Sequence, residues 1–158
     1  MKKIIILALL TVMTVMGAQA EAGRFSGGGQ FSYASKRSMA GLGVQLQYEP
    51  VTNLRVAPEF IYYFENDGLS ASNVNVNLHY VIPTSASFAL YPLAGFSYAH
   101  FNADTWRVGG SVNRCGANIG LGAQYLIKEH ITFFTEQRFQ IIKDFNQSVT
   151  LLGLKYTF

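Results

Sequence analysis

The chain has 158 residues, of which 49% are hydrophobic, 14% aromatic and only 13% charged. This composition excludes an intrinsically disordered chain and a collagen-like repeat, and it predicts a single folded domain. The longest uncharged apolar run, residues 4–18, is shorter than the roughly 20 residues that a membrane-spanning helix needs. The sequence therefore argues against a helical membrane protein.

Residues 1–20 have the order of a secretory signal peptide. Two lysines give a basic start, an apolar stretch follows, and residues 18–20 form a small-residue A-x-A site. We expect cleavage before Glu21, so that residues 21–158 form the mature barrel domain. The alternative is that the segment stays attached as an N-terminal anchor, for which the apolar run is short.

The charge and the cysteine content indicate which partners and which covalent or metal cross-links to expect. Removal of the two N-terminal lysines lowers the formal net charge from +3 to +1, so the charge gives no reason to expect a nucleic-acid partner. The single cysteine, Cys115, cannot form an internal disulfide. No group of His, Cys, Asp and Glu has metal-ligand spacing, and we expect no metal and no cofactor.

From Phe25 onward, apolar residues recur with a period of two, which indicates strands whose two faces differ. Proline residues Pro58 and Pro92 lie inside two of these strands, where we expect local β-bulges because proline cannot donate a ladder hydrogen bond. The pattern predicts eight strands, at residues 25–34, 41–49, 54–64, 73–82, 88–100, 116–125, 131–141 and 148–158.

The predicted connections alternate in length. The longer ones, at one end, are residues 35–39, 65–72, 101–113 and 142–147, whereas the tighter turns, at the other end, are residues 50–53, 83–87 and 127–130. Long loops at one end and short turns at the other are typical of a barrel in a bacterial outer membrane. The predicted fold class is therefore all-β: an eight-stranded antiparallel up-and-down transmembrane β-barrel.

The composition of the two strand faces favours lipid outside the barrel, although a soluble barrel or sandwich would also alternate. The polar face is largely Gly, Asn, Gln and Ser, which suit a narrow lumen better than a face exposed to water. Aromatic residues lie toward the strand ends of the apolar face, as in the girdles of membrane barrels. They are Tyr33, Tyr48, Tyr62, Phe64, Tyr80, Phe88, Tyr98, Tyr125, Phe133, Phe139, Tyr156 and Phe158.

Three segments carry a resemblance to known proteins. The closing stretch is similar to the C-terminal assembly signal of outer-membrane barrels, and its apolar face consists of Leu152, Leu154, Tyr156 and Phe158. With residues 120–125 and 133–139, it makes the chain similar to the small eight-stranded outer-membrane barrel family, the OmpA/OmpX-like and opacity-like proteins. The resemblance implies a location among outer-membrane lipids and insertion by the barrel assembly machinery, but it implies function only weakly.

The charged residues of the polar face are the most informative set, because an eight-stranded barrel is about wide enough to be filled by side chains. The third and seventh predicted strands lie on opposite walls, so we expect Glu59 and Arg138 to meet across the lumen. A closed, charge-paired lumen is favoured because an unpaired buried charge is costly, and a narrow passive pore is the alternative. The expected lumen network is Glu49, Arg55, Glu59, His79, Glu136, Arg138 and Lys155.

The longest predicted loop holds the strongest candidate for surface binding. Trp106 stands beside Arg107 there, a pair of residue types enriched in binding hot spots. An interfacial tryptophan anchor explains the pair equally well. Basic residues at this end could also neutralise lipopolysaccharide phosphates. We expect a structural or surface-binding role, with a ligand that the sequence does not identify.

A lipid-modifying enzyme is the third hypothesis. Neither of two possible residue trios has a recognised motif, and catalytic sites are identified by geometry rather than by residue type. We therefore expect that the protein is not an enzyme. The two trios are His100, Asp104 and Ser111 near the longest loop, and His130, Thr132 and Glu136 near a turn.

Overall fold

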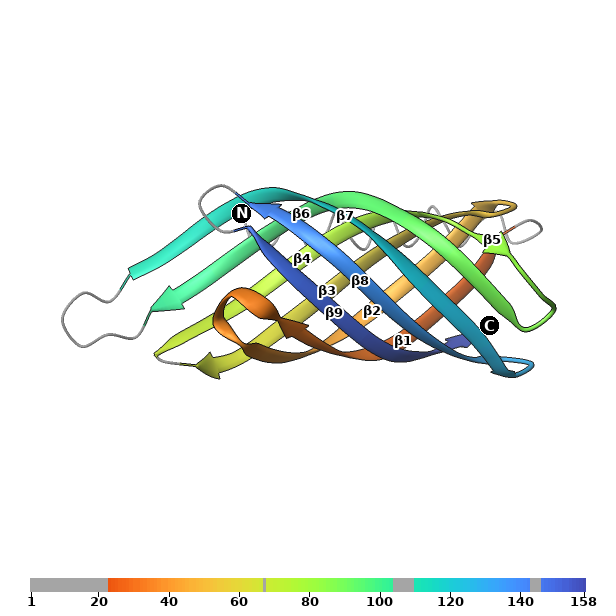
Figure 1. Cartoon of the computed structure of the whole chain (residues 1–158), viewed down its shortest axis with the longest axis horizontal. Helices are drawn as coiled ribbons and strands as arrows, with labels where there is room; N and C mark the ends of the chain where they lie inside the picture. Colours follow the sequence, from red (N-terminus) through yellow and green to blue (C-terminus); the bar gives the residue numbers. More distant parts are fainter. Residues whose placement is uncertain (1–22, 67, 104–109, 143–145) are drawn as a thin grey trace.

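The computed structural model describes residues 23–66, 68–103, 110–142 and 146–158. Within these residues, eight long antiparallel strands form a closed barrel (Figure 1). The barrel strands are β1 (Arg24–Ala34), β2 (Met39–Val51), β3 (Leu54–Asn66), β4 (Leu69–Tyr80), β6 (Phe88–Ala103), β7 (Gly110–Lys128), β8 (Ile131–Ile142) and β9 (Gln147–Thr157). The predicted fold class is confirmed.

Strands that follow one another in sequence are neighbours in the sheet, β1 pairs with β9, and the pairing of β4 with β6 closes the barrel. Closure leaves no sheet edge whose backbone groups would meet lipid without partners. The short strand β5 (Ile82–Pro83) pairs with β6 next to β4, and a single 3-10 turn, η1 (Ser35–Arg37), joins β1 to β2. No helix among the described residues is long and apolar enough to cross a membrane.

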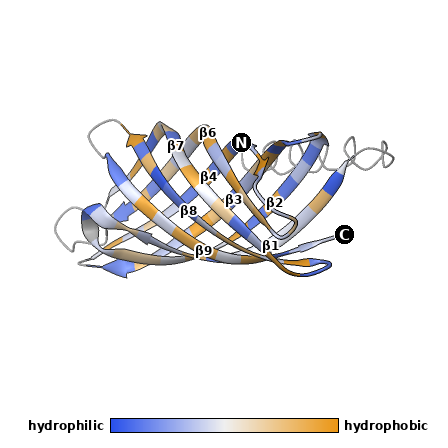
Figure 2. Ribbon diagram, turned by 45° about the vertical axis from the view of Figure 1, so that its right-hand side comes forward, coloured by the Kyte–Doolittle hydropathy of each residue, from blue (hydrophilic) through white to orange (hydrophobic). Residues whose placement is uncertain are grey.

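The two faces of the wall differ as the alternation predicts. Hydrophobic and hydrophilic residues alternate along the strands (Figure 2). Large apolar side chains lie outside: Leu121 is 66% exposed and Leu42 is 56% exposed, which a water-soluble domain would avoid over so wide a surface. Tyr33, Tyr62 and Tyr98 are among the exposed aromatic residues of this wall. An apolar outer wall with aromatic residues is typical of a barrel in lipid.

The two ends of the barrel differ less in loop length than the sequence predicts. We call the end with η1 the loop end and the opposite end, with β5, the turn end. Strands β3 and β4 pair as far as Asn66 and Leu69, and β6 and β7 pair as far as Ala103 and Gly110. The predicted loops at 65–72 and 101–113 were therefore wrong, because backbone pairing continues where outward positions such as Ser70, Ser72 and Asn102 are polar and break the apolar alternation.

The two prolines are accommodated without the expected bulges. The β2–β3 ladder is interrupted beside Pro58 but keeps its register on both sides. The β4–β6 ladder stops at His79 and Leu93, and β5 resumes the same register beyond Pro92. Each proline thus lies where one neighbour makes no ladder bond, so the missing N–H costs nothing. The register shifts of β3 lie elsewhere, next to the turns: between Tyr48 and Val51 in its ladder with β2, and between Tyr63 and Asn66 in its ladder with β4.

Candidate functional site: the barrel lumen

The lumen has three zones along the barrel axis. The central ion cluster (Glu59, Glu136 and Arg138) is buried at mid-height. An apolar plug fills the loop end, and a hollow that we call the vestibule opens at the turn end. The sequence pattern places each residue inside or outside the wall, whereas the zones arise from the stagger of the strands.

Glu59 is the centre of the polar network. Its carboxylate accepts two hydrogen bonds from the guanidinium of Arg138, one of them at 2.9 Å, across the lumen from β3 to β8. It also accepts side-chain amide hydrogen bonds from Gln30 at 3.0 Å, Gln45 at 3.2 Å and Asn75 at 2.7 Å. A two-pronged guanidinium–carboxylate pair with further donors is a strong arrangement for buried charges.

Glu136 is the second carboxylate of the cluster. It lies two residues before Arg138 on β8 and accepts a hydrogen bond of 2.6 Å from it. The hydroxyl of Tyr91 donates to the other carboxylate oxygen at 2.9 Å. The ring of His79 stacks on Tyr91 with centroids 4.8 Å apart, and its Nε2 lies 4.0 Å from Glu136. The cluster thus holds two carboxylates and one guanidinium.

A chain of amides leads from the cluster toward the turn end. Gln45, which donates to Glu59, accepts a hydrogen bond from Gln47. Gln47 in turn accepts one from the ammonium of Lys155 at 2.6 Å. The carboxylate at mid-height and the ammonium nearer the turn end are therefore linked only through two neutral side chains.

Arg55 and Lys155 converge on one acceptor. The side-chain oxygen of Gln124 accepts from Arg55 at 3.0 Å and from Lys155 at 2.9 Å. Arg55 also lies 3.6 Å from the carboxylate of Glu49, whose other oxygen accepts the backbone N–H of Asn53 at 3.1 Å. These groups form the floor of the vestibule.

The vestibule has a volume of about 610 Å³. Its lining contains basic residues at two depths: Arg24 is exposed at the rim, whereas Arg55 and Lys155 are buried below it. Acidic Glu49 and Glu129 also line it, together with Ser26 and other neutral residues. A hollow of this size suits a small solute.

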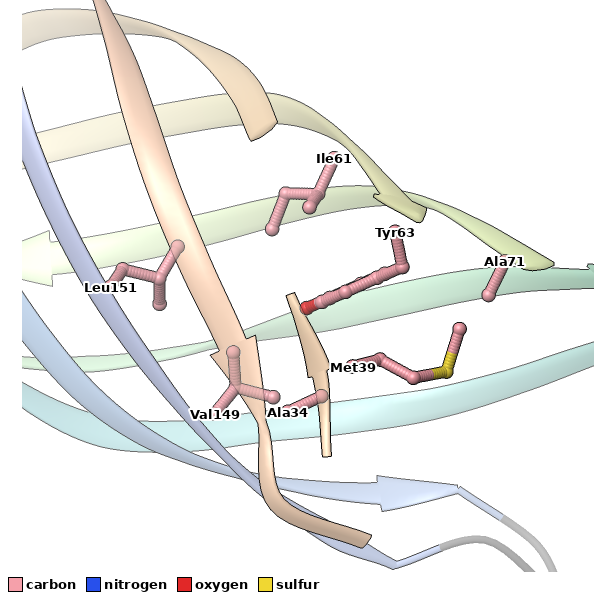
Figure 3. Close-up of a cluster of buried hydrophobic side chains, with 7 residues drawn as sticks. All are labelled: Ala34, Met39, Ile61, Tyr63, Ala71, Val149 and Leu151. Atoms are coloured by element: carbon pink, nitrogen blue, oxygen red, sulfur yellow. The ribbon is translucent and has the colours of Figure 1, made fainter. Parts of the chain in front are cut away.

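The apolar plug is a feature that the sequence analysis missed. Figure 3 shows its seven side chains gathered between strands β1, β2, β3, β4 and β9. Leu69 and Phe101 pack against it. Several apolar residues at inward positions of the alternation were the available signal, but strands far apart in sequence bring them to one height. The plug consists of Ala34, Met39, Ile61, Tyr63, Ala71, Val149 and Leu151.

The structure brings some predicted residues together and leaves others apart. Trp106, Arg107 and Asp104 lie outside the described residues. The His100 ring nitrogen Nδ1 lies 2.5 Å from the side-chain oxygen of Asn113, across the β6–β7 pair. Of the second trio, His130 contacts the backbone oxygen of Thr157, whereas Glu136 bonds Arg138 and Tyr91. None of these contacts links His130, Thr132 and Glu136 as a catalytic triad would require.

The residues of the predicted assembly signal lie on the outer wall. Leu154 and Tyr156 are exposed on β9. The ring of Phe158 lies 5.7 Å from that of Phe25 and 5.3 Å from that of Tyr156. An aromatic group at the turn end joins the last and first strands, and its role in assembly stays a prediction.

Comparison with solved structures supports the fold. The N-terminal barrel domain of Pseudomonas aeruginosa OprF is 16% identical with a TM-score of 0.76, over 85% of this chain and 97% of that one. Ail, the attachment invasion locus protein of Yersinia pestis, is 17% identical with a TM-score of 0.65, over 86% and 97%. Neisserial surface protein A is 15% identical with a TM-score of 0.65, over 86% and 96%.

Sequence comparison gives the family. No curated protein is significantly similar to the chain. The profile of one family, described as the outer membrane protein beta-barrel domain, matches residues 5–158. This match includes all eight barrel strands, and it agrees with the apolar outer wall and the polar lumen. The chain belongs to the outer membrane protein beta-barrel domain family.

Proposed function

We propose that this protein is a closed outer-membrane barrel with a structural or surface-binding role. The observation that carries the proposal is the filled lumen: the central ion cluster and the apolar plug lie in series along the axis. A solute crossing the barrel would have to break charge pairs and then displace packed apolar side chains. Both steps oppose the narrow pore that was the alternative.

Conductance tests this proposal. Purified protein in planar bilayers should show no steady conductance, because both barriers are intact. A Tyr63→Ala/Arg138→Ala variant, which removes a large side chain from each barrier, should conduct and thus show that insertion is efficient. Steady channels from the unaltered protein, inserted with the same orientation and yield as the double variant, would favour the narrow pore.

A surface-binding role rests on the loop end. Ail has the same fold, and its structure is known in complex with the heparin analogue sucrose octasulfate. We propose that Trp106 and Arg107, which lie in the sequence between β6 and β7 and outside the described residues, form a binding site of this protein. Replacing both with Ala should weaken binding of cells expressing the protein to immobilised heparin, whereas Lys36→Ala at another loop should have less effect. If the double variant binds heparin as strongly as the unaltered protein, Trp106 and Arg107 are membrane anchors rather than a binding site.

Export and assembly complete the proposal. We propose cleavage before Glu21, recognition of the final strand by the barrel assembly machinery, and contact with lipopolysaccharide at the loop end. The intact mass of membrane-extracted protein should correspond to residues 21–158. Deleting Phe158 should lower the amount of folded barrel in the outer membrane, while Phe139→Ala, which removes an aromatic ring elsewhere on the outer wall, should lower it less.

We also propose that the protein is not an enzyme. The contacts of His130 and Glu136 use the groups that a catalytic trio would need for one another. Incubation of the purified barrel with phospholipid and lipopolysaccharide should release no fatty acid. Release of fatty acid that disappears in a His100→Ala or a Ser111→Ala variant would overturn this proposal and identify the first trio as catalytic.

A further inference from the structure

The vestibule is a hollow that the closed-barrel proposal does not use. It is open at the turn end, and its lining includes Glu49, Gln124 and two basic side chains. Its floor is formed by Arg55 and Lys155, which are 7% and 5% exposed. Two buried cations at the bottom of an accessible hollow are costly unless something compensates their charge.

Carboxylates of the protein compensate only part of the positive charge on the vestibule floor. Lys155 donates to the side-chain oxygens of Gln47 and Gln124, which are neutral. Among the described residues, no carboxylate lies within the 4.0 Å ion-pair distance of its ammonium. An ammonium has three N–H donors, so one remains beyond these two amide oxygens. The nearest carboxylate to the floor cations is that of Glu49, 3.6 Å from Arg55.

The charges are also unevenly distributed along the axis. The central ion cluster has two carboxylates and one guanidinium, whereas the floor has two cations and one carboxylate. The neutral side chains of Gln45 and Gln47 separate the two groups. The surplus negative charge is therefore enclosed, and the surplus positive charge faces the open hollow.

We propose that the vestibule binds a small water-soluble oxyanion, a carboxylate or a phosphate group, on Arg55 and Lys155. The guanidinium of Arg55 has five N–H donors, of which one is accepted by Gln124 and another faces Glu49, so others remain for such a group. The ammonium of Lys155 offers its remaining donor. Exposed Arg24 at the rim adds long-range attraction for anions entering from the turn end. The volume of about 610 Å³ leaves space for the rest of a solute that carries the group.

The test is a titration followed by nuclear magnetic resonance of the side-chain amide of Gln124, in phosphatidylcholine nanodiscs. Acetate and inorganic phosphate are added separately, with sodium chloride at matched ionic strength as the reference. At least one of the two should give a saturable shift that chloride does not reproduce. Lys155→Gln should weaken this binding at least tenfold, and Arg24→Gln should weaken it about two- to threefold.

The matched control is Lys128→Gln, because Lys128 is an exposed lysine of the turn end that does not line the vestibule. It should bind like the unaltered protein. If Lys155→Gln does not fold, the exposed Arg24→Gln variant still tests whether the vestibule binds the anion. Equal weakening in Arg24→Gln and Lys128→Gln, or shifts that match those of chloride, would overturn the proposal. A shift caused by phosphatidylglycerol nanodiscs without added solute would assign the site to lipid headgroups instead.

Discussion

The central ion cluster and the apolar plug fill the same lumen in opposite ways. Glu59 accepts hydrogen bonds from four side chains on four other strands, β1, β2, β4 and β8, so each partner depends on the rest. The plug consists of apolar side chains, whose contacts are not directional, and of Tyr63, whose buried hydroxyl makes no hydrogen bond of regular geometry among the described residues. Loss of a partner in the cluster leaves a buried charge uncompensated, whereas loss of a side chain in the plug leaves only a cavity.

This contrast indicates how an eight-stranded barrel divides two tasks. Directional pairs such as Glu59 with Arg138 join opposite walls and hold the strands at one stagger. Apolar side chains exclude water at the loop end without requiring partners. The variants below separate the two contributions through the free energy of unfolding in urea, measured by reversible folding into detergent micelles or lipid vesicles.

The largest effect is expected for Arg138→Ala. The variant leaves Glu59 and Glu136 without their shared cation in the interior, where an unpaired charge is destabilising by about 3–5 kcal/mol. The midpoint of urea unfolding measures this loss. A loss below that of a plug variant would contradict the view that the cluster is the more demanding of the two regions.

Leu151→Ala comes next and tests the plug. Leu151 is fully buried, and removal of its side chain should lower the free energy of unfolding by about 2–4 kcal/mol. Its neighbour Leu152 faces outward and is 45% exposed. Leu152→Ala is therefore the matched control, with a smaller expected loss. Equal losses in the two variants would mean that the plug is not packed as the structure shows.

The Glu59→Ala/Arg138→Ala double variant measures the coupling between the two walls. Each single variant strands a charged partner, so the double variant should recover about 1–3 kcal/mol relative to the sum of the single losses. A double-mutant cycle with Arg138→Ala and Leu151→Ala should show no such recovery, because these side chains belong to different zones. Strictly additive losses in the first cycle would show that Glu59 and Arg138 do not act as a pair.

The sequence predicted the pair but not the plug, and the reason is geometric. Period-two alternation places Glu59 and Arg138 inside, and strand order alone puts their strands on opposite walls. The plug requires Ile61 and Leu151 to reach the same height, which depends on the register between β1 and its neighbours. Register follows from the turns and from glycine positions. At Gly28, for example, a Cβ would lie 2.1 Å from the backbone oxygen of Leu154.

The sequence pattern did not predict the vestibule either. Lys155 and Arg55 were predicted to face inward, but their shared acceptor Gln124 lies on a third strand. Similarly, the strand ends near Asn66 could not be placed from apolar alternation, because the outward Ser70 and Ser72 are polar and the inward Ala71 is apolar. Sequence patterns therefore assign faces well, whereas heights and ends depend on contacts between strands.

Two buried tyrosines, one bonded to the central ion cluster and one in the apolar plug, allow the same substitution to be compared in both zones. The hydroxyl of Tyr91 donates to the carboxylate of Glu136 at 2.9 Å. Tyr91→Phe removes one of the donors of a buried carboxylate and should lower the free energy of unfolding by about 1.5 kcal/mol, as expected for a hydrogen bond to a charged group. No loss in urea unfolding would show that Glu136 is satisfied by Arg138 alone.

Tyr63→Phe should have the smallest effect. The ring of Tyr63 lies in the apolar plug, and its buried hydroxyl makes no hydrogen bond of regular geometry among the described residues, although the hydroxyl of Ser32 lies near it. Removing a hydroxyl without a regular hydrogen bond gives up no such bond and relieves the cost of burying it, so stability should change by less than about 0.5 kcal/mol or increase. Tyr91→Phe is the matched control, since the same atom is removed from the other zone. If Tyr63→Phe lost as much stability as Tyr91→Phe, its hydroxyl would have to be hydrogen-bonded, and the plug would share the directional character of the ion cluster.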